Sequence, residues 1–167
     1  MSLFNLSDYD TVKSPLLNGR YISSSMLNDV LSKLNNNALI EINEIGKSVK
    51  NKPISIIKIG SGSIKIFFWS QMHGNETTTT KAIIDFLNLL IINNDKDLVK
   101  TLLNRCTLYI IPMLNPDGAD AYTRVNANLV DLNRDAQNLS QPESKILRNA
   151  FNKIKPDYCF NLHGQRT

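Results

Sequence analysis

The stretch that decides the fold is IKIFFWSQMHGNETTTTKAIIDFLNLLI, residues 64–91. It opens with an apolar run from Ile64 to Trp69 that is typical of a strand. The polar segment SQMHGNE at 70–76 follows and indicates a loop. The last part carries apolar residues at helical spacing on one face, namely Ile83, Ile84, Leu87, Leu90 and Ile91. The stretch therefore predicts a strand, a loop and a helix, in that order.

The same order recurs further along the chain. A short helical segment at 95–105 precedes TLYIIPML at 107–114, a continuous apolar run typical of a strand buried on both faces. A capping box with a proline in its first turn, Ser140-Gln141-Pro142-Glu143, predicts the start of another helix, and Pro156 ends it. The segment DYCFNL at 157–162 then predicts one more short buried strand. Strands that alternate with helices favour parallel pairing of the inner strands.

The residues upstream predict a helix and three strands. SSSMLNDVLSKLNNN at 23–37 has helical spacing behind a serine cap, and the segment from Leu39 to Lys50 is strand-like. The runs Ile54 to Ile59 and Ile64 to Trp69 flank Gly60-Ser61-Gly62-Ser63, which indicates a hairpin turn between them. We therefore expect these two strands to pair.

These elements together predict an α/β fold with a mixed, mostly parallel sheet flanked by helices and a hairpin at one edge. The chain of 167 residues has a 42% apolar content, enough for one core. No repeat, low-complexity linker or break in composition divides it. We expect a single domain at 1–167, in which residues 1–38 form an N-terminal arm and helix.

Charge and patterning exclude several classes of function. The net charge is +4, but the basic residues are scattered singly, so we expect no nucleic-acid partner. The N-terminus has neither a basic head before an apolar run nor a stretch long enough to cross a bilayer. We expect a soluble, cytoplasmic protein with no membrane partner. Cys106 and Cys159 adjoin apolar strand-like segments, which favours buried free thiols over a disulfide.

Both histidines of the chain follow predicted strands. His73 comes after the strand at 64–69, and His163 ends the strand at 157–162. Ligands of open α/β sheets bind at the carboxyl ends of the strands. The spacing His-x-x-Glu at His73 and Glu76 lets both side chains reach one ion, and His163 would complete three ligands. Two histidines and a glutamate with an open fourth position form a catalytic zinc set. The alternative is that each histidine is an ordinary core or surface residue.

Five motifs resemble, in order, the signatures of the carboxypeptidase A-like zinc metallopeptidases. They are MHGNE, NPDG, the arginine in YTRVNAN, DLNRD and NLHG. The resemblance implies that His73, Glu76 and His163 bind one catalytic Zn²⁺ ion. It also implies that Arg124 polarises the scissile carbonyl and stabilises its oxyanion, so that Arg124 is both catalytic and substrate-binding.

The resemblance further implies that Asn133 and Arg134 bind the terminal carboxylate of the substrate. A guanidinium group meets a carboxylate through two parallel hydrogen bonds, and an asparagine amide adds a donor. Outside that resemblance, Arg124 and Arg134 could be solvated charges of the long polar loop at 115–135. A loop of that length usually has a function.

Three other features of this loop allow plainer interpretations. The turn formers Asn115-Pro116-Asp117-Gly118 predict a turn that ends a strand and aims Arg124. Asp131 and Asp135 could orient a histidine, or they could be exposed loop carboxylates. Asp135 departs from the family, which more often has asparagine followed by an aromatic residue at this place.

The family also carries residues well beyond the third zinc ligand, including a glutamate that serves as general base. This chain stops four residues after His163. It resembles the N-terminal part of a family catalytic domain, so we expect a sheet that is incomplete at the C-terminus. By itself the chain should be inactive, and it should self-associate through the truncated sheet.

The resemblance implies a zinc metallocarboxypeptidase that hydrolyses the C-terminal peptide bond. Its substrate would be a peptide, or an acyl amino acid, with a free carboxylate. Two alternatives stay open: a related zinc amidohydrolase of N-acyl amino acids, and a non-catalytic module that binds peptide ends.

Overall fold

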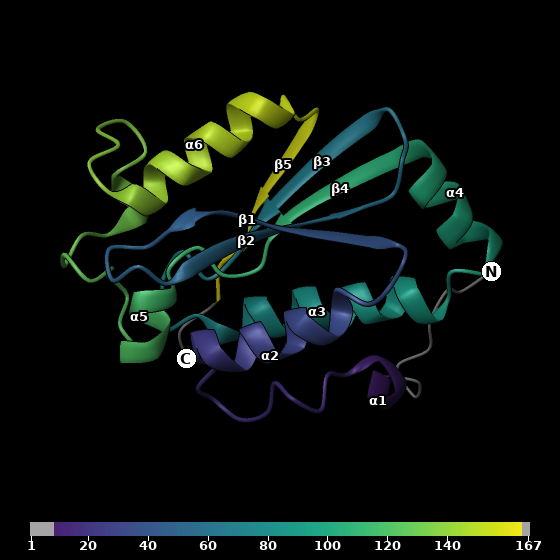
Figure 1. The fold of residues 1–167 in the computed structure, drawn as a ribbon, viewed down its shortest axis with the longest axis horizontal. Coiled ribbons are helices and arrows are strands. Elements are labelled where there is room, and N and C mark those ends of the chain that lie inside the picture. The colour runs from purple at the N-terminus through teal and green to yellow at the C-terminus, as the bar shows by residue number, and fades with distance from the viewer. Residues whose placement is uncertain (1–8, 165–167) are drawn as a thin grey trace.

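A five-stranded mixed sheet lies at the centre of the computed structural model, which describes residues 9–164 (Figure 1). In spatial order its strands are β1 (Ile40–Lys47), β2 (Pro53–Ile59), β4 (Cys106–Ile111), β3 (Ile64–Trp69) and β5 (Tyr158–Asn161). The pairs β1–β2 and β2–β4 are antiparallel, whereas β4–β3 and β3–β5 are parallel. The predicted α/β class and the mixed sheet are confirmed. The first eight residues of the predicted N-terminal arm lie outside the described residues.

The predicted hairpin between the second and third strands is wrong, because β4 lies between β2 and β3. The linker Gly60-Ser61-Gly62-Ser63 does not fold back on itself. The N–H of Ser61 donates to the carbonyl of Leu103 and the N–H of Gly62 to that of Cys106, so the linker binds the chain where it enters β4. An edge hairpin does exist, but β1 and β2 form it.

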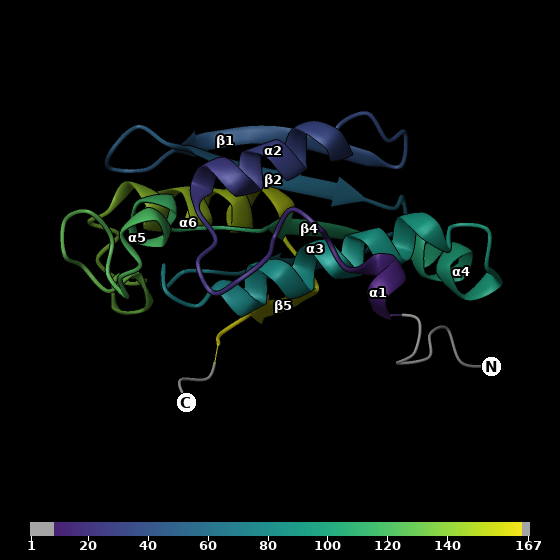
Figure 2. The same cartoon turned by 90° about the horizontal axis from the view of Figure 1, so that it is seen from below.

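Helices cover both faces of the sheet. Helices α2 (Ser24–Leu34) and α3 (Thr77–Ile92) lie on one side and α6 (Pro142–Ile154) on the other, as Figures 1 and 2 show. The remaining helical segments are α1 (Tyr9–Val12), α4 (Asp97–Arg105), α5 (Pro116–Ala121) and a 3-10 turn (Leu132–Arg134). Among residues 9–164, no helix has both the length and the hydropathy needed to cross a membrane.

Each face of the sheet has its own hydrophobic core. Burial of apolar side chains in both is the main force that holds the helices against the sheet. The first core includes Leu27 and Val30 of α2, Ile84 and Leu87 of α3, and Leu108 of β4. The second core lies under α6 and its buried members are Ile54, Phe67, Met72, Ile111, Leu114, Leu132 and Ile154.

Strand β5 is exposed, contrary to the prediction of a buried strand. It forms one edge of the sheet, and within the described residues only β3 pairs with it. Tyr158 is 60% exposed and Phe160 is 47% exposed. The predicted burial of Cys159 is wrong for the same reason, whereas Cys106 on the inner strand β4 is buried, and both thiols are free.

The predicted capping box at the start of α6 is also wrong. The N-cap residue is Gln141, and no side chain caps the helix there. The Ser140 hydroxyl donates to Asp135, and the Glu143 carboxylate accepts from the backbone N–H of Val49. Both side chains are therefore used in contacts between segments. Pro142 lies in the first turn as predicted.

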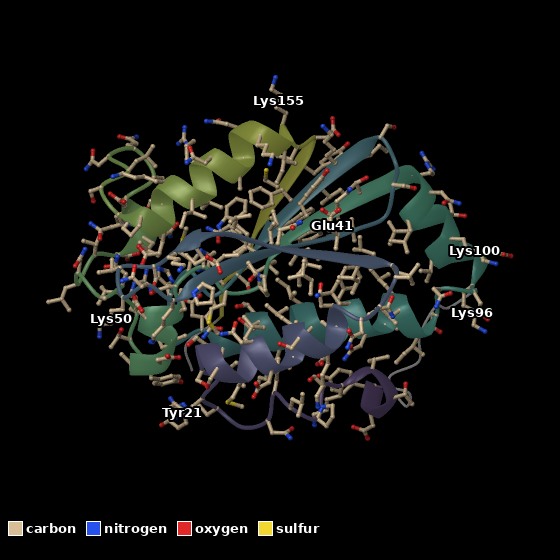
Figure 3. The ribbon with its side chains drawn as sticks, in the orientation of Figure 1. Tyr21, Glu41, Lys50, Lys96, Lys100 and Lys155 are labelled. Atoms are coloured by element: carbon tan, nitrogen blue, oxygen red, sulfur yellow. The ribbon has the colours of Figure 1, made fainter. Side chains whose placement is uncertain are left out.

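The long loop after β4 is more regular than its composition predicts. NPDG forms the start of helix α5, where Asn115 is the N-cap and its side chain accepts from the N–H of Gly118. The turn of β1–β2 contacts this helix, because the N–H of Lys50 donates to Asp117. Figure 3 shows Lys50 at this end of the molecule and Lys96 and Lys100 at the other, so these basic side chains do not cluster.

Candidate metal centre

The segment between β3 and α3 forms a tight turn that brings His73 and Glu76 together. The N–H of Glu76 donates to the carbonyl of His73 at 3.0 Å. Buried Gln71 adopts a left-handed backbone conformation at φ 46° and donates from its side chain to the carbonyl of Gly74 at 2.8 Å. The other end of that side chain accepts from Thr80 of α3. Gln71 thus fixes the turn from within, a role that its sequence context does not reveal.

Three side chains converge at the carboxyl ends of the parallel strands. One donor atom from each of His73, Glu76 and His163 lies within 4.8 Å of the other two. The Nδ1 atom of His73 is 2.8 Å from Oε1 of Glu76, and the Nδ1 atom of His163 is 3.0 Å from Oε2. The structure therefore brings together all three residues that the sequence analysis named as metal ligands.

Glu76 is the most constrained of the three. It is the N-cap residue of α3 but does not cap it, because both carboxylate oxygens face the histidines. The N–H of Gly164 also donates to Oε2 at 2.9 Å. Burial raises the pKa of Glu76, but the hydrogen bond from Gly164 and the contacts with His73 and His163 outweigh burial and hold the pKa below its usual value. The carboxylate is therefore ionised at neutral pH, as a metal ligand must be.

Asp131 orients His73 from the other side of the ring. Its Oδ1 lies 3.0 Å from Nε2 of His73 and also accepts from the N–H of Asn133 at 2.9 Å. This contact favours a proton on Nε2, which leaves the lone pair of Nδ1 free to face the ion. A donor set of two imidazole nitrogens and one ionised carboxylate fits zinc. One of the two open interpretations of Asp131, that it orients a histidine, agrees with this geometry.

Arg124 lies beside the candidate ligands. Its Nε donates to Oδ2 of Asp131 at 3.0 Å, and its Nη1 is 3.9 Å from Oε1 of Glu76. Burial raises the pKa of Asp131, but hydrogen bonds from His73, Asn133 and Arg124 outweigh it and lower that pKa overall. One ionised carboxylate thus contacts a candidate ligand, His73, the cation Arg124 and the 3-10 turn Leu132–Arg134.

The other predicted site residues are less tightly connected. Asn133 and Arg134 form the 3-10 turn after Asp131, and no polar contact joins their side chains to the candidate ligands within residues 9–164. Asp135 does not orient a histidine, because its buried carboxylate accepts from Ser140 and from the N–H of Gln141.

Two glycines place the metal-ligand turn, a role that the sequence did not predict for either of them. A Cβ added to Gly74 would overlap the backbone of Gly118 and Ala119, so only a glycine lets this turn lie against α5. A Cβ on Gly118 would in turn overlap Asn115 and the carbonyl of Val125. Both motifs, MHGNE and NPDG, contain a glycine, but only a folded chain shows that these two glycines meet.

Known proteins with similar sequences belong to one family. The family model for zinc carboxypeptidases matches residues 27–167. The chain is 34% identical over 146 residues to "Gamma-D-glutamyl-L-diamino acid endopeptidase 1" of Lysinibacillus sphaericus, covering 78% of this chain and 37% of that protein. It is also 34% identical over 137 residues to "Carboxypeptidase SOL1" of Arabidopsis thaliana, covering 72% and 28%.

A solved structure agrees with the fold. The crystal structure of a carboxypeptidase A homologue from Shewanella denitrificans superposes with a TM-score of 0.81 at 26% identity, covering 87% of this chain and 40% of that one. The chain thus spans about two fifths or less of the length of these three proteins. The matched residues include every motif from MHGNE to NLHG, and the chain belongs to the zinc carboxypeptidase family.

Proposed function

We propose that this chain is the metal-binding part of a zinc-dependent metallocarboxypeptidase that hydrolyses the C-terminal peptide bond of its substrates. The observation that carries the proposal is the convergence of His73, Glu76 and His163 within 4.8 Å, in a chain of this family. Zinc, when bound, supplies a Lewis acid that polarises a carbonyl and lowers the pKa of a water molecule.

The chain's own residues bind and orient the substrate in this proposal. Arg124 presents a guanidinium group next to Glu76, where it can stabilise the negative charge that develops on the carbonyl oxygen. Asn133 and Arg134 take the terminal carboxylate, which selects for chain ends because it fixes which peptide bond lies over the metal. The exposed side chain of Arg134 is free to meet that carboxylate.

Among the described residues, no unengaged carboxylate at the centre is left to act as a general base. Glu76 and Asp131 are the carboxylates at the centre, and each uses both oxygens in the contacts given above. General acid–base catalysis typically contributes about a hundredfold to ten-thousandfold in rate. We therefore propose that this chain alone binds zinc and peptide ends but turns over peptides very slowly.

Binding measurements test the proposal without relying on turnover. We expect the chain to take up one zinc ion and, once loaded, to bind a peptide with a free C-terminus more tightly than the same peptide with an amidated C-terminus. The variant Arg134→Gln should weaken binding of the free carboxylate about tenfold, the scale of a charge-assisted hydrogen bond. The matched variant Arg105→Gln, at the end of α4, should not.

Three results would contradict parts of the proposal. A chain that takes up no zinc would remove the metal centre. Equal affinity for free and amidated peptides would remove the carboxylate site. Steady, metal-dependent release of terminal amino acids by this chain would show that its 167 residues contain the base.

The substrate class is the finer question. Peptides, N-acyl amino acids and γ-D-glutamyl-L-diamino acid peptides belong in one assay panel, the last because of the name of the Lysinibacillus relative. We propose ordinary peptide ends as the preferred class. Preference for N-acyl amino acids would instead indicate the amidohydrolase, and tight binding of peptide ends without hydrolysis in every longer form would indicate a binding module.

A further inference from the structure

The loop that carries Arg124 is closed at its base. Arg124 and Asp131 form the ion pair described above, and between them the N–H of Asn126 donates to the carbonyl of Val130 at 3.0 Å. The tip is exposed, and Leu129 adopts a left-handed conformation at φ 62° there. Among residues 124–131 only Asn126 is buried. The buried residue of this loop is therefore polar, and no buried apolar side chain of residues 124–131 anchors it.

Every hydrogen-bonding group of the Asn126 side chain is in use. Its Nδ2 donates to Oε1 of Gln141 at 2.9 Å and to Oε2 of Glu143 at 3.1 Å. Its Oδ1 accepts from the N–H groups of Asn128 at 3.0 Å and Val130 at 3.1 Å. An asparagine side chain has two donors and about two acceptor sites, so nothing is left unsatisfied. An asparagine satisfied in this way has a single favourable position.

Glu143 connects this side chain to the rest of the fold. It is fully buried at 0% exposure, and its Oε1 accepts from the N–H of Val49 at 3.2 Å. Val49 lies in the turn between β1 and β2, and Glu143 lies in the first turn of α6. The three residues Asn126, Gln141 and Glu143, here called the Asn126 bracket, thus bind the loop to a helix and a hairpin that are distant in sequence.

A buried polar cluster of this kind destabilises the fold unless each of its groups has a hydrogen-bond partner. A buried carboxylate or amide without partners destabilises a protein, whereas apolar residues of similar shape often do as well or better. The stability of the fold alone therefore does not require polar side chains here. The bracket does fix the position of the loop base, together with the pair Arg124–Asp131 and the bond from Nδ2 of Asn128 to Oε1 of Gln141 at 2.9 Å.

We propose that Asn126 and Glu143 are positioning residues, which act through the loop to hold Arg124 and Asp131 against the metal centre. This proposal rests on the function proposed above, in which Arg124 meets the substrate carbonyl. Neither residue touches substrate, and Arg124 is the group through which both act. If the loop moved, two contacts would be lost at the same time: that of Asp131 with His73 and that of Arg124 with Glu76.

The test reverses the polarity of one hydrogen bond. Asn126→Asp replaces the Nδ2 donor with an oxygen that faces the carboxylate of Glu143, so the bracket should open. In the double variant Asn126→Asp, Glu143→Gln, the new amide can donate to Asp while its oxygen still accepts from Val49. The double variant should therefore recover most of what the single variant loses. Asn152→Asp on the exposed side of α6 makes the same change of charge as a control.

The main measurement is solvent exchange of the Nε–H proton of Arg124 by NMR, because this N–H donates a hydrogen bond to Asp131. We expect exchange about tenfold faster in Asn126→Asp, near the wild-type rate in the double variant, and unchanged in the control. In Asn126→Asp, the zinc-loaded chain should also bind benzoylglycine, an N-acyl amino acid with a free carboxylate, less tightly. The exchange measurement needs no zinc or substrate, so it can fail independently of the proposed function.

A merely structural role gives a different pattern. In that case Asn126→Asp would lower the melting temperature while the Arg124 proton and the affinity for benzoylglycine stayed unchanged, which would overturn the proposal. A double variant that is no better than the single variant would also overturn it. If Asn126→Asp does not fold, Gln141→Ala removes one acceptor of Asn126 without adding charge, and it should still speed the exchange of the Arg124 proton.

Discussion

At the scale of single residues, the candidate centre depends on carboxylates that serve several partners at once. Glu76 contacts two histidines and accepts from a backbone N–H, and Asp131 contacts His73, Asn133 and Arg124. Such sharing lowers the pKa of both groups and holds them ionised. It also means that replacing one residue disturbs more than one function.

The first prediction ranks two residues by their effect on zinc affinity. Asp131→Ala removes a group that orients His73, a change that typically costs about tenfold to a hundredfold in metal affinity. His163→Ala removes a candidate ligand and should cost more, because three donors become two. Competition with a zinc chelator measures both. A larger loss for Asp131→Ala would show that His163 does not bind the metal.

The second prediction concerns stability against acid. Burial raises the pKa of Asp135, but hydrogen bonds from Gln141 and Ser140 outweigh it and lower the pKa to about 2. Because the folded pKa lies below the unfolded one of about 3.9, this group stabilises the fold above about pH 4. That contribution is lost as the pH falls through the folded value.

Chemical denaturation across this range, on wild type and Asp135→Asn, measures the effect. The variant should be less stable by about 1–2 kcal/mol at neutral pH, since one amide donor faces the N–H of Gln141 or Ser140. The difference between the two proteins should shrink between about pH 4 and pH 2. A difference that does not change with pH would mean that Asp135 is not the group that titrates.

At the scale of elements, the backbones of the metal-ligand turn and α5 approach each other closely. Gly74 and Gly118 make this approach possible, and Gln71 and Asn115 hold the two segments with hydrogen bonds. The carboxyl ends of β3 and β4 are thereby fixed at one position. This contact also fixes the position of His73, which lies in the same turn.

The third prediction follows from that contact. Gly74→Ala should destabilise the fold by about 1–3 kcal/mol through overpacking, and it should weaken zinc binding because the turn must move away from α5. Thermal unfolding and zinc titration measure the two effects. Gly19→Ala is the matched control, because an added Cβ there meets nothing and only its left-handed φ of 78° adds a cost. Equal losses in both variants would argue against a steric contact.

At the scale of the whole molecule, the exposed edge strand β5 offers a surface for association. All four residues of β5 are exposed, and the ring of Phe160 stacks on Phe68 with the centroids 5.0 Å apart. An unprotected edge strand with aromatic side chains offers both backbone groups and apolar area to a partner. We propose that the isolated chain associates with itself through this strand.

The fourth prediction tests this association. The weight-average mass of the chain should rise with concentration in sedimentation experiments. Phe160→Lys should reduce the rise, because a charged edge resists pairing. Phe151→Lys on α6 changes another exposed phenylalanine and should have little effect. A chain that stays monomeric at all concentrations, or an equal response in both variants, would contradict the proposal.

The sequence by itself predicted the four longer helices α2, α3, α4 and α6, the positions of all five strands and three candidate metal ligands that converge in the fold. Hydrophobic periodicity is local, so the apolar faces of α2 and α3 follow from the spacing of their residues along the chain. The spacing of His73 and Glu76 is also local, since one turn brings them together.

Only the tertiary structure decided the contacts between distant segments. The linker Gly60 to Ser63 has the composition of a hairpin, yet the pairing of β3 with β4 is decided by energies spread over the whole sheet. Likewise, Glu143 has the spacing of a capping box, but it accepts from Asn126 and Val49, two donors that only the folded chain brings to it. Local patterns determine which elements form, whereas the partners of a buried polar group depend on which donors the complete fold brings within reach.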